Sequence, residues 1–240
     1  MTDFVRYIAH RGLHGKALPE NSMAAFEAAA QKGLAVELDV RLTKDGKLVV
    51  LHDSSLMRVC GVEGEVRDFT AEQLGAFRLN GSGEGIPMFR EVLKRINGRV
   101  PLLIEIKNCD HGSIEPRVRR ILKSYKGSYA VQAFDPRTVL WFRLFAPSVC
   151  RGQLISTRRF GSFWEYIARV ISASPIVWKY ITKPDFIAAD IRSLTPELVA
   201  QIRGAGMALL VWTVKDDAAL DKAQALADGI IFEGDVLTKI

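Results

Sequence analysis

Apolar and polar residues alternate most clearly in the segment AVELDVRL. Its charged residues, Glu37, Asp39 and Arg41, occupy every second position, so in a β-strand they lie on one face while apolar residues fill the other. The sequence TKDG follows, and Asp-Gly is a dipeptide typical of hairpin turns. We therefore predict that residues 47–51 return as an antiparallel strand and bring His52 near Glu37.

Short apolar segments recur along the whole chain, and segments with a helical spacing of apolar residues separate most of them. Apolar runs of this kind, bounded by turn residues, are typical of buried strands. Eight strands are predicted: residues 6–9, 35–41, 101–107, 129–134, 152–156, 186–191, 208–214 and 229–232. Strands that alternate with helices favour a parallel sheet, so a chain of 240 residues with eight such units is predicted to be an α/β protein with a (β/α)8 TIM barrel. Residues 47–51 then form an added hairpin arm.

The main alternative is a doubly wound open sheet. That fold carries a glycine-rich nucleotide fingerprint after its first strand, and HRGLHG at residues 10–15 lacks the required spacing. We therefore expect one barrel domain over residues 1–240. Residues 53–85 show no clear periodicity and are interpreted as a loop excursion over the active face, and residues 157–184 as a variable amphipathic segment.

The composition is that of a globular protein with a sizeable core, since 48% of the residues are hydrophobic and 25% are charged. The formal charge of +6 weakly favours anionic ligands, although a mildly basic surface is the simpler interpretation. Three widely spaced cysteines without a C-x-x-C pair argue against a disulfide framework and against a zinc site. No apolar run reaches membrane-spanning length, so we expect a cytoplasmic protein.

Several charged residues lie at or near the ends of predicted strands. His10 directly follows the first strand, and Glu105 shares one face of the third strand with Lys107. Barrel enzymes keep their chemistry at the carboxyl ends of the strands. On the second strand, Glu37 and Asp39 are costly to bury as ions unless a cation compensates them, and a divalent metal ion is the simplest compensation.

Short motifs occur along the chain in a specific order: AHRG at 9–12, PENS at 19–22, ELDV at 37–40 with TKDG at 43–46, VLHD at 50–53 followed by Arg58, and IEIK at 104–107. In order and spacing they resemble the glycerophosphodiester phosphodiesterases, within a wider group that includes the phosphoinositide-specific phospholipases C. VQAFD at 131–135 and VWTV at 211–214 extend the resemblance over nearly the whole chain. The segment IFEGD at 231–235 departs from the family, which often has Ile-Thr-Asp-x-Pro there.

The resemblance implies a metal-dependent barrel enzyme that hydrolyses glycerophosphodiesters to sn-glycerol 3-phosphate and an alcohol. It implies that acid–base catalysis is carried out by His10 and His52. It implies that one divalent cation is held by Glu37, Asp39 and Glu105. It implies that the phosphate or other parts of the substrate are bound by Arg11, Lys107, Gln132, Phe134 and Trp212.

Elementary chemistry agrees with these roles. A phosphodiester is an anion that repels nucleophiles, so its hydrolysis needs charge neutralisation and a proton for the leaving alkoxide. Three carboxylates offer only oxygen ligands, which suits Mg²⁺ or Ca²⁺ rather than zinc. Two histidines can supply an acid and a base, although the sequence does not decide which histidine serves which step.

Alternative interpretations stay open at this point. A lysophospholipase D that acts on lipid phosphodiesters is the alternative among enzymes, and a catalytically silent phosphate- or lipid-binding barrel is the alternative from another class. Phe134 and Trp212 either line the pocket or pack inside the barrel. Residues 157–184 either pack on the protein or form a lid that touches a membrane surface transiently. We expect no nucleic-acid partner, and the oligomeric state is not predicted.

Overall fold

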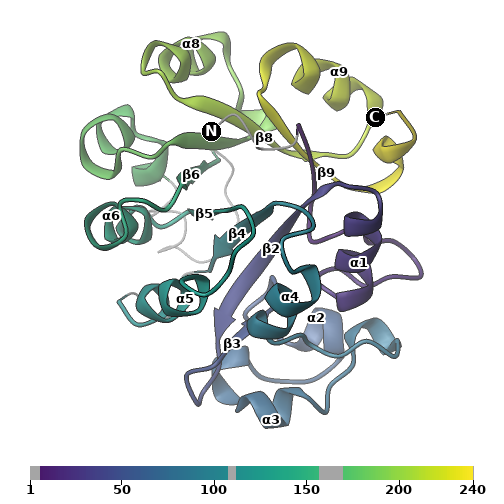
Figure 1. The fold of residues 1–240 in the computed structure, drawn as a ribbon. Coiled ribbons are helices and arrows are strands. Elements are labelled where there is room, and N and C mark those ends of the chain that lie inside the picture. The colour runs from purple at the N-terminus through teal and green to yellow at the C-terminus, as the bar shows by residue number, and fades with distance from the viewer. Residues whose placement is uncertain (1–5, 108–111, 157–169, 240) are drawn as a thin grey trace. The chain divides into compact units, whose positions relative to one another are not determined.

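The structure is a computed structural model that describes residues 6–107, 112–156 and 170–239. The chain divides into two compact units. We refer to Ala9–Tyr129 as the first unit and to Met1–Ile8 with Ala130–Ile240 as the second unit. Figure 1 labels helices and strands from both units, though not every one.

The first unit combines two parallel strands, an antiparallel arm and helices. Its elements are α1 (Met23–Gln31), β2 (Ala35–Leu42), β3 (Leu48–Val50), α2 (Met57–Cys60), η1 (Val66–Asp68), α3 (Ala71–Leu74), η2 (Leu79–Gly81), α4 (Phe89–Ile96), β4 (Leu102–Ile106) and α5 (Ile114–Leu122). Strand β2 pairs in parallel with β4 and antiparallel with β3, which lies beside it in Figure 1. The predicted hairpin arm is therefore confirmed.

The turn between β2 and β3 sets the register of the arm. The Gly46 N–H donates to the Thr43 carbonyl at 3.0 Å, and the Thr43 N–H donates to the Lys47 carbonyl at 2.9 Å. Gly46 adopts φ 73, a left-handed conformation that favours glycine. This closed turn pairs Val40 with Val50, and the Leu51 N–H continues the pairing to the Asp39 carbonyl at 3.0 Å.

Helix α1 begins at a hydroxyl cap. The side chain of Ser22 accepts a hydrogen bond from the Ala25 N–H at 3.1 Å, which satisfies one of the free N–H groups of the first turn. The loop before the helix crosses it closely at Gly12, where φ is 80 and an added Cβ would lie 2.8 Å from the Ala25 carbonyl carbon. Only glycine fits this crossing, which holds the residues that precede Gly12 close to α1.

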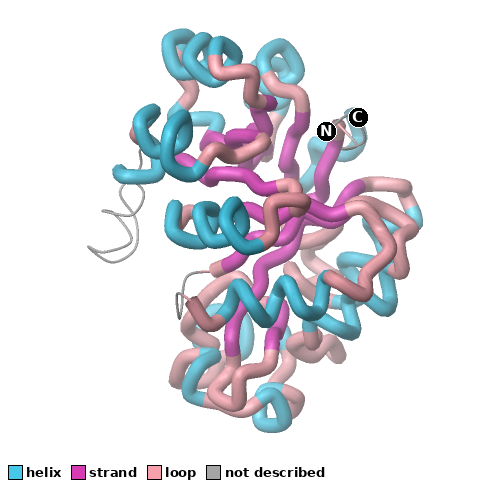
Figure 2. The backbone as a smooth tube through the Cα atoms, turned by 60° about the vertical axis from the view of Figure 1, so that its left-hand side comes forward, coloured by secondary structure: helices cyan, strands magenta, loops and turns pink. Residues whose placement is uncertain are grey.

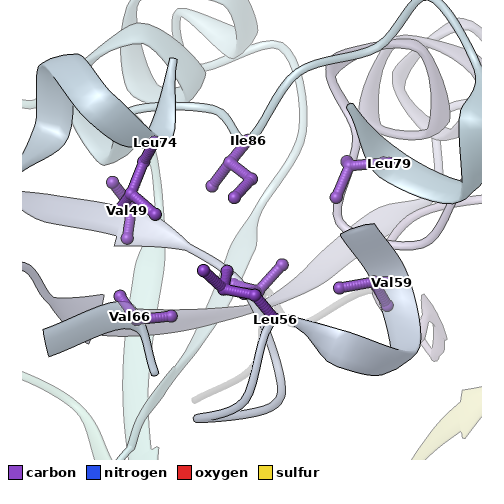
Figure 3. Close-up of a cluster of buried hydrophobic side chains, with 8 residues drawn as sticks. Val49, Leu56, Val59, Val66, Leu74, Leu79 and Ile86 are labelled. Atoms are coloured by element: carbon purple, nitrogen blue, oxygen red, sulfur yellow. The ribbon is translucent and has the colours of Figure 1, made fainter. Parts of the chain in front are cut away.

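Residues 53–85 form a packed substructure rather than a plain loop. Four short helical segments, α2, η1, α3 and η2, surround a hydrophobic cluster of their own (Figure 3). The buried members of this cluster are Val49, Leu51, Leu56, Val59, Val66, Leu74, Leu79 and Ile86. The longest of these helices has four residues, too few to show a helical period in the sequence. The loop excursion predicted for residues 53–85 therefore contains short helices with a core, and its position over the active face stays a prediction.

The second unit repeats strand and helix in turn. Its elements are β1 (Tyr7–Ala9), β5 (Tyr129–Ala133), α6 (Pro136–Phe145), β6 (Arg151–Ile155), η3 (Val177–Thr182), β7 (Phe186–Asp190), η4 (Ile191–Ser193), α8 (Pro196–Gly204), β8 (Ala208–Val214), α9 (Asp217–Leu226), β9 (Gly229–Phe232) and η5 (Gly234–Lys239). Strands β5 to β9 pair in parallel, each with the next in the sequence. Figure 2 colours strands and helices separately and shows this alternation along the backbone.

The fold class is the (β/α)8 barrel, as predicted. Strands β1, β2 and β4 to β9 are its eight strands, helices come between them, and β3 is the added arm. Each predicted strand of the barrel begins and ends within one residue of the observed strand. Among the described residues, no helix is both long enough and apolar enough to cross a membrane.

The amphipathic segment predicted at 157–184 is described only in part, because residues 157–169 lie outside the described residues. In the described part, Trp178 is fully buried, whereas Ile176, Tyr180 and Ile181 are exposed. The guanidinium of Arg143, near the end of α6, donates to the carbonyls of Tyr180 and Ile181. This apolar surface therefore adjoins the end of α6 and the start of β7.

We expect Leu56→Ala to destabilise the protein by about 2–4 kcal/mol, because Leu56 is fully buried in the cluster of Figure 3 and its loss leaves a cavity. Urea unfolding followed by circular dichroism measures the change. Met57→Ala is the matched control, since the neighbouring Met57 is 48% exposed. Equal losses in the two variants would contradict a packed core in this segment.

Candidate active site

Three carboxylates from neighbouring strands meet in the first unit. Asp39 on β2 is the register partner of Glu105 on β4, and Glu37 lies two residues earlier on the same face of β2. One oxygen atom from each of the three residues lies within 4.8 Å of the other two. All three side chains are buried, so the structure brings together the acidic residues that the sequence predicts as metal ligands.

Cationic and amide groups surround the carboxylate of Asp39. Lys107 Nζ lies 2.9 Å from Asp39 Oδ1 and also pairs with Glu105. Arg11 Nε lies 3.5 Å from Asp39 Oδ2, and Asn21 Nδ2 donates to the same oxygen at 2.8 Å. Burial alone would raise the pKa of Asp39, but the positive charge of Lys107, followed by other neighbours, holds it well below its usual range. Asp39 is therefore ionised in the folded protein.

Glu37 is compensated far less. Its Oε2 accepts a hydrogen bond from the Arg11 backbone N–H at 3.0 Å, but its Oε1 is buried and has no hydrogen-bond partner among the described residues. Burial first, and then the charges of Asp39 and Glu105, raise the pKa of Glu37 well above its usual value. A bound cation would satisfy this oxygen and remove the repulsion. The buried, oxygen-only donor set thus fits one hard divalent cation.

The loop after β1 adopts an unusual backbone to reach these carboxylates. Arg11 has φ 54 and Asn21 has φ 55, both in the left-handed region that side-chain-bearing residues seldom adopt. The Asn21 N–H donates to the Arg11 carbonyl at 2.9 Å, which ties the two residues together. This geometry lets the Arg11 backbone reach Glu37 and the Asn21 amide reach Asp39.

Both histidines interact with the carboxylate cluster, His10 with Glu37 and His52 through its charge with Asp39. His10 Nε2 is 4.0 Å from Glu37 Oε2. His52 Nδ1 is 2.6 Å from Asp53 Oδ1, and the Arg41 guanidinium donates to the His52 carbonyl at 2.9 and 2.6 Å. Arg41, the third charged residue of the alternating segment, thus holds the end of the arm where the sequence predicts His52.

Three functional candidates lie in the second unit. Gln132 is buried on β5. The rings of Phe134 and Trp212 meet edge to face, with centroids 5.6 Å apart, and Trp212 Nε1 donates to the Ala188 carbonyl at 3.0 Å. Both aromatic rings remain partly accessible, and their role as pocket walls stays a prediction.

Sequence reasoning gave no role to Glu20, Asp53 and Arg58, although all three belong to the quoted motifs. In the structure they form one ionic network. Arg58 donates to Asp53 and to Glu20, and Glu20 also accepts from Arg11. Membership in the motifs was the available signal, because no periodicity relates residues so far apart in the chain.

Comparison with known families places this chain. The sequence model described as "Glycerophosphoryl diester phosphodiesterase family" matches residues 10–233. The chain belongs to that family. It is therefore an enzyme, a glycerophosphodiester phosphodiesterase, as the motifs predict.

Relatives match this chain over nearly its full length. The protein YhdW of Bacillus subtilis (strain 168) is 33% identical over 235 residues, which cover 93% of this chain and 92% of YhdW. A glycerophosphodiester phosphodiesterase of Caldanaerobacter subterraneus subsp. tengcongensis is 32% identical over 237 residues, with coverage of 93% and 92%.

A solved structure supports the fold. The phosphodiesterase of Oleispira antarctica, in complex with the product sn-glycerol-3-phosphate, superposes with a TM-score of 0.81 and covers 97% of this chain and 94% of that chain. Its sequence identity is 24%, so the likeness establishes the barrel fold and nothing finer.

We expect Glu37→Gln to stabilise the metal-free protein at pH 8. Because the pKa of Glu37 is raised in the folded state, the stability that its proton gives is complete below the unfolded pKa and is lost as the pH rises through the folded pKa. The neutral amide of the variant avoids this loss, so its melting temperature in EDTA should exceed that of the wild type by a few degrees at pH 8 and by less at pH 5.

If the folded carboxylates bind a cation, added Mg²⁺ or Ca²⁺ should raise the melting temperature of the wild type more than that of Glu37→Gln. Glu63→Gln is the control, because Glu63 is exposed in the segment between α2 and η1. If Glu63→Gln changes the profile as much as Glu37→Gln, the repulsion within the cluster is not its cause.

Proposed function

We propose that this protein hydrolyses glycerophosphodiesters to sn-glycerol 3-phosphate and an alcohol, with one divalent cation, Mg²⁺ or Ca²⁺, and two catalytic histidines. The observation that carries the proposal is the buried cluster of three carboxylates, with His10 beside Glu37 and with the charge of His52 acting on Asp39. Family membership supports the reaction class. The product in the Oleispira antarctica complex supports glycerol 3-phosphate as the phosphate product.

In this proposal the cation is held by Glu37, Asp39 and Glu105. When bound, it supplies positive charge that neutralises the phosphate and polarises its oxygens. The unpartnered Glu37 oxygen and the raised pKa of Glu37 support a cation at this place. Arg11 and Lys107 add further positive charge beside the same carboxylates, which suits the binding of an anionic phosphodiester.

His10 and His52 carry the proton transfers in this proposal. Hydrolysis needs a proton taken from the nucleophile and a proton given to the leaving alkoxide, and two imidazoles can do both. Each ring has a carboxylate neighbour, Glu37 for His10 and Asp53 for His52. Because the Asp53 carboxylate accepts from His52 Nδ1, Nε2 is the nitrogen left to meet the substrate.

Gln132, Phe134 and Trp212, all in the second unit, stay proposed as substrate-binding residues because of the motifs that contain them. Phe134 and Trp212 offer an aromatic wall for the alcohol part, and the buried Gln132 carbonyl oxygen lacks a hydrogen-bond partner among the described residues.

We further propose a reducing, cytoplasmic location. The free thiols Cys60 and Cys150 support it.

A lipid phosphodiester is the alternative substrate, and one observation bears on it. Five exposed apolar residues, Leu144, Phe145, Ile176, Tyr180 and Ile181, belong to α6 or to η3 and its first flanking residue, and Val170 and Ile171 are exposed as well. The end of α6 leads into the start of β6, and η3 leads into the start of β7. Barrel enzymes place chemistry at the other ends of the strands, so the exposed residues of α6 and η3 do not favour an acyl-chain wall.

The proposed function predicts release of glycerol 3-phosphate from glycerophosphocholine by the wild type. Chelation with EDTA should abolish release, and Mg²⁺ or Ca²⁺ should restore it. His10→Ala and His52→Ala should each lower kcat by at least about 100-fold, because each removes a proton carrier. An enzyme-coupled assay for glycerol 3-phosphate measures all of these rates.

Ser54→Ala is the matched control for His52→Ala, since Ser54 is an exposed neighbour. Circular dichroism verifies that each variant is folded. Release that persists unchanged in EDTA would contradict the metal assignment, and release that survives both histidine substitutions would contradict the acid–base pair.

The lipid alternative makes a separate prediction about Tyr180 and Ile181. We expect Tyr180→Ser and Ile181→Ser to change cleavage of lysophosphatidylcholine and of glycerophosphocholine equally, by less than about twofold, because exposed substitutions away from a site have small effects. Parallel assays of the two substrates measure the ratio. A selective loss of lysophospholipid cleavage would instead support the lipid alternative and a membrane contact at this surface.

A further inference from the structure

The carboxylate of Glu20 lies between two guanidinium groups. Its Oε1 accepts from Arg11 Nη1 at 2.8 Å and from Arg58 Nη2 at 2.6 Å, and its Oε2 accepts from Arg58 Nη1 at 3.0 Å. Glu20 stands two residues before the cap of α1, and Arg58 lies on α2, 38 residues further along the chain. The contact therefore joins the loop that carries Arg11 to the substructure formed by residues 53–85.

Arg58 also reaches the histidine end of the site. Its Nε donates to Asp53 Oδ2 at 2.5 Å, and the other Asp53 oxygen lies 2.6 Å from His52 Nδ1. Three nitrogen atoms of one planar guanidinium thus contact two carboxylates, a fork geometry that lysine cannot reproduce. The neighbouring residue Val59 is buried in the cluster of Figure 3, which holds α2 and therefore Arg58 in place.

The network alternates positive and negative groups. Hydrogen bonds from Arg58 and Arg11 outweigh the effect of burial and lower the pKa of Glu20. Burial opposes ionisation of Asp53 too, but the hydrogen bonds from His52 and Arg58 lower its pKa. Both carboxylates are therefore ionised at neutral pH, and an ionised carboxylate can only accept the proton of His52 Nδ1.

We propose that Glu20 and Arg58 are positioning residues of the active site. Arg58 fixes the carboxylate of Asp53, which in turn holds the His52 ring with its proton on Nδ1 and leaves Nε2 for the substrate. Glu20 anchors Arg58 from the opposite side and at the same time orients the guanidinium of Arg11. The inference rests on the proposed function, because it assigns His52 and Arg11 their roles there.

The competing interpretation is an ordinary surface ion pair, since half of the Arg58 side chain is exposed. Exposed ion pairs contribute little to stability and nothing to catalysis. The chain offers a matched example in Arg67, whose Nε lies 2.8 Å from Glu65 and whose side chain is 61% exposed. Arg67 belongs to the same substructure but makes no hydrogen bond or ion pair with Glu20, Asp53 or His52 in the described part of the chain, so it is a fair control.

The test compares Arg58→Ala, Glu20→Gln and Arg67→Ala in two measurements. For glycerophosphocholine, Arg58→Ala should lower kcat by about 10–100-fold with a smaller change in KM, as expected when a partner of a catalytic group is lost. Arg67→Ala should keep the kcat of the wild type. In proton NMR, the downfield His52 Nδ1–H signal, assigned by its loss in His52→Ala, should persist in Arg67→Ala and exchange away in Arg58→Ala.

The outcomes separate this inference from the proposed function. A wild type that never releases glycerol 3-phosphate refutes the function, whereas the NMR signal still tests the network without turnover. The inference is overturned if Arg58→Ala keeps kcat within about twofold, if its His52 signal is unchanged, or if the wild type lacks that signal. Should Arg58→Ala fail to fold, Glu20→Gln is judged by the same kcat and NMR criteria. This variant keeps the shape of the side chain and removes its charge.

Discussion

The parallel register of β2 and β4 places three acidic side chains in one buried spot, and the rest of the site follows from that constraint. Asp39 lies opposite Glu105. Glu37, two residues before Asp39, points to the same face because side chains alternate along a strand. Buried carboxylates so close together repel one another and lose hydration. Lys107 and Arg11 offset part of this cost for Asp39, whereas Glu37 keeps an oxygen without a hydrogen-bond partner among the described residues, an arrangement that a hard divalent cation would fit.

The same constraint explains why the loop after β1 is strained. Arg11 and Asn21 both adopt left-handed backbone angles, which cost a residue such as arginine about 1–3 kcal/mol and which asparagine adopts more readily. In return, the Arg11 N–H reaches Glu37 and the Asn21 amide reaches Asp39. Gly12, which has no side chain, lets the loop pass close to Ala25 of α1. Local strain is thus held at the site by the packing around it.

Sequence reasoning could place the strands and the carboxylates but not the ionic network. The alternation around Glu37 and Asp39 reports which face of β2 is polar, and apolar runs mark the strands, because both are local properties. The helices of residues 53–85 have four residues or fewer, so they leave no period to detect. The contact between Glu20 and Arg58 depends on tertiary packing, which no local pattern encodes.

The arm shows how register links folding to chemistry. Strand β2 is paired on both sides, with β4 supplying an acidic residue and β3 leading directly to His52. Two hydrogen bonds hold the end of the arm against β2. The Arg41 side chain donates to the His52 carbonyl, and the Leu51 N–H donates to the Asp39 carbonyl. A slip of one residue in this pairing would turn every side chain of the arm to the opposite face. The turn at Gly46 therefore sets the position of the His52 imidazole relative to the carboxylates. The turn itself lies outside the site.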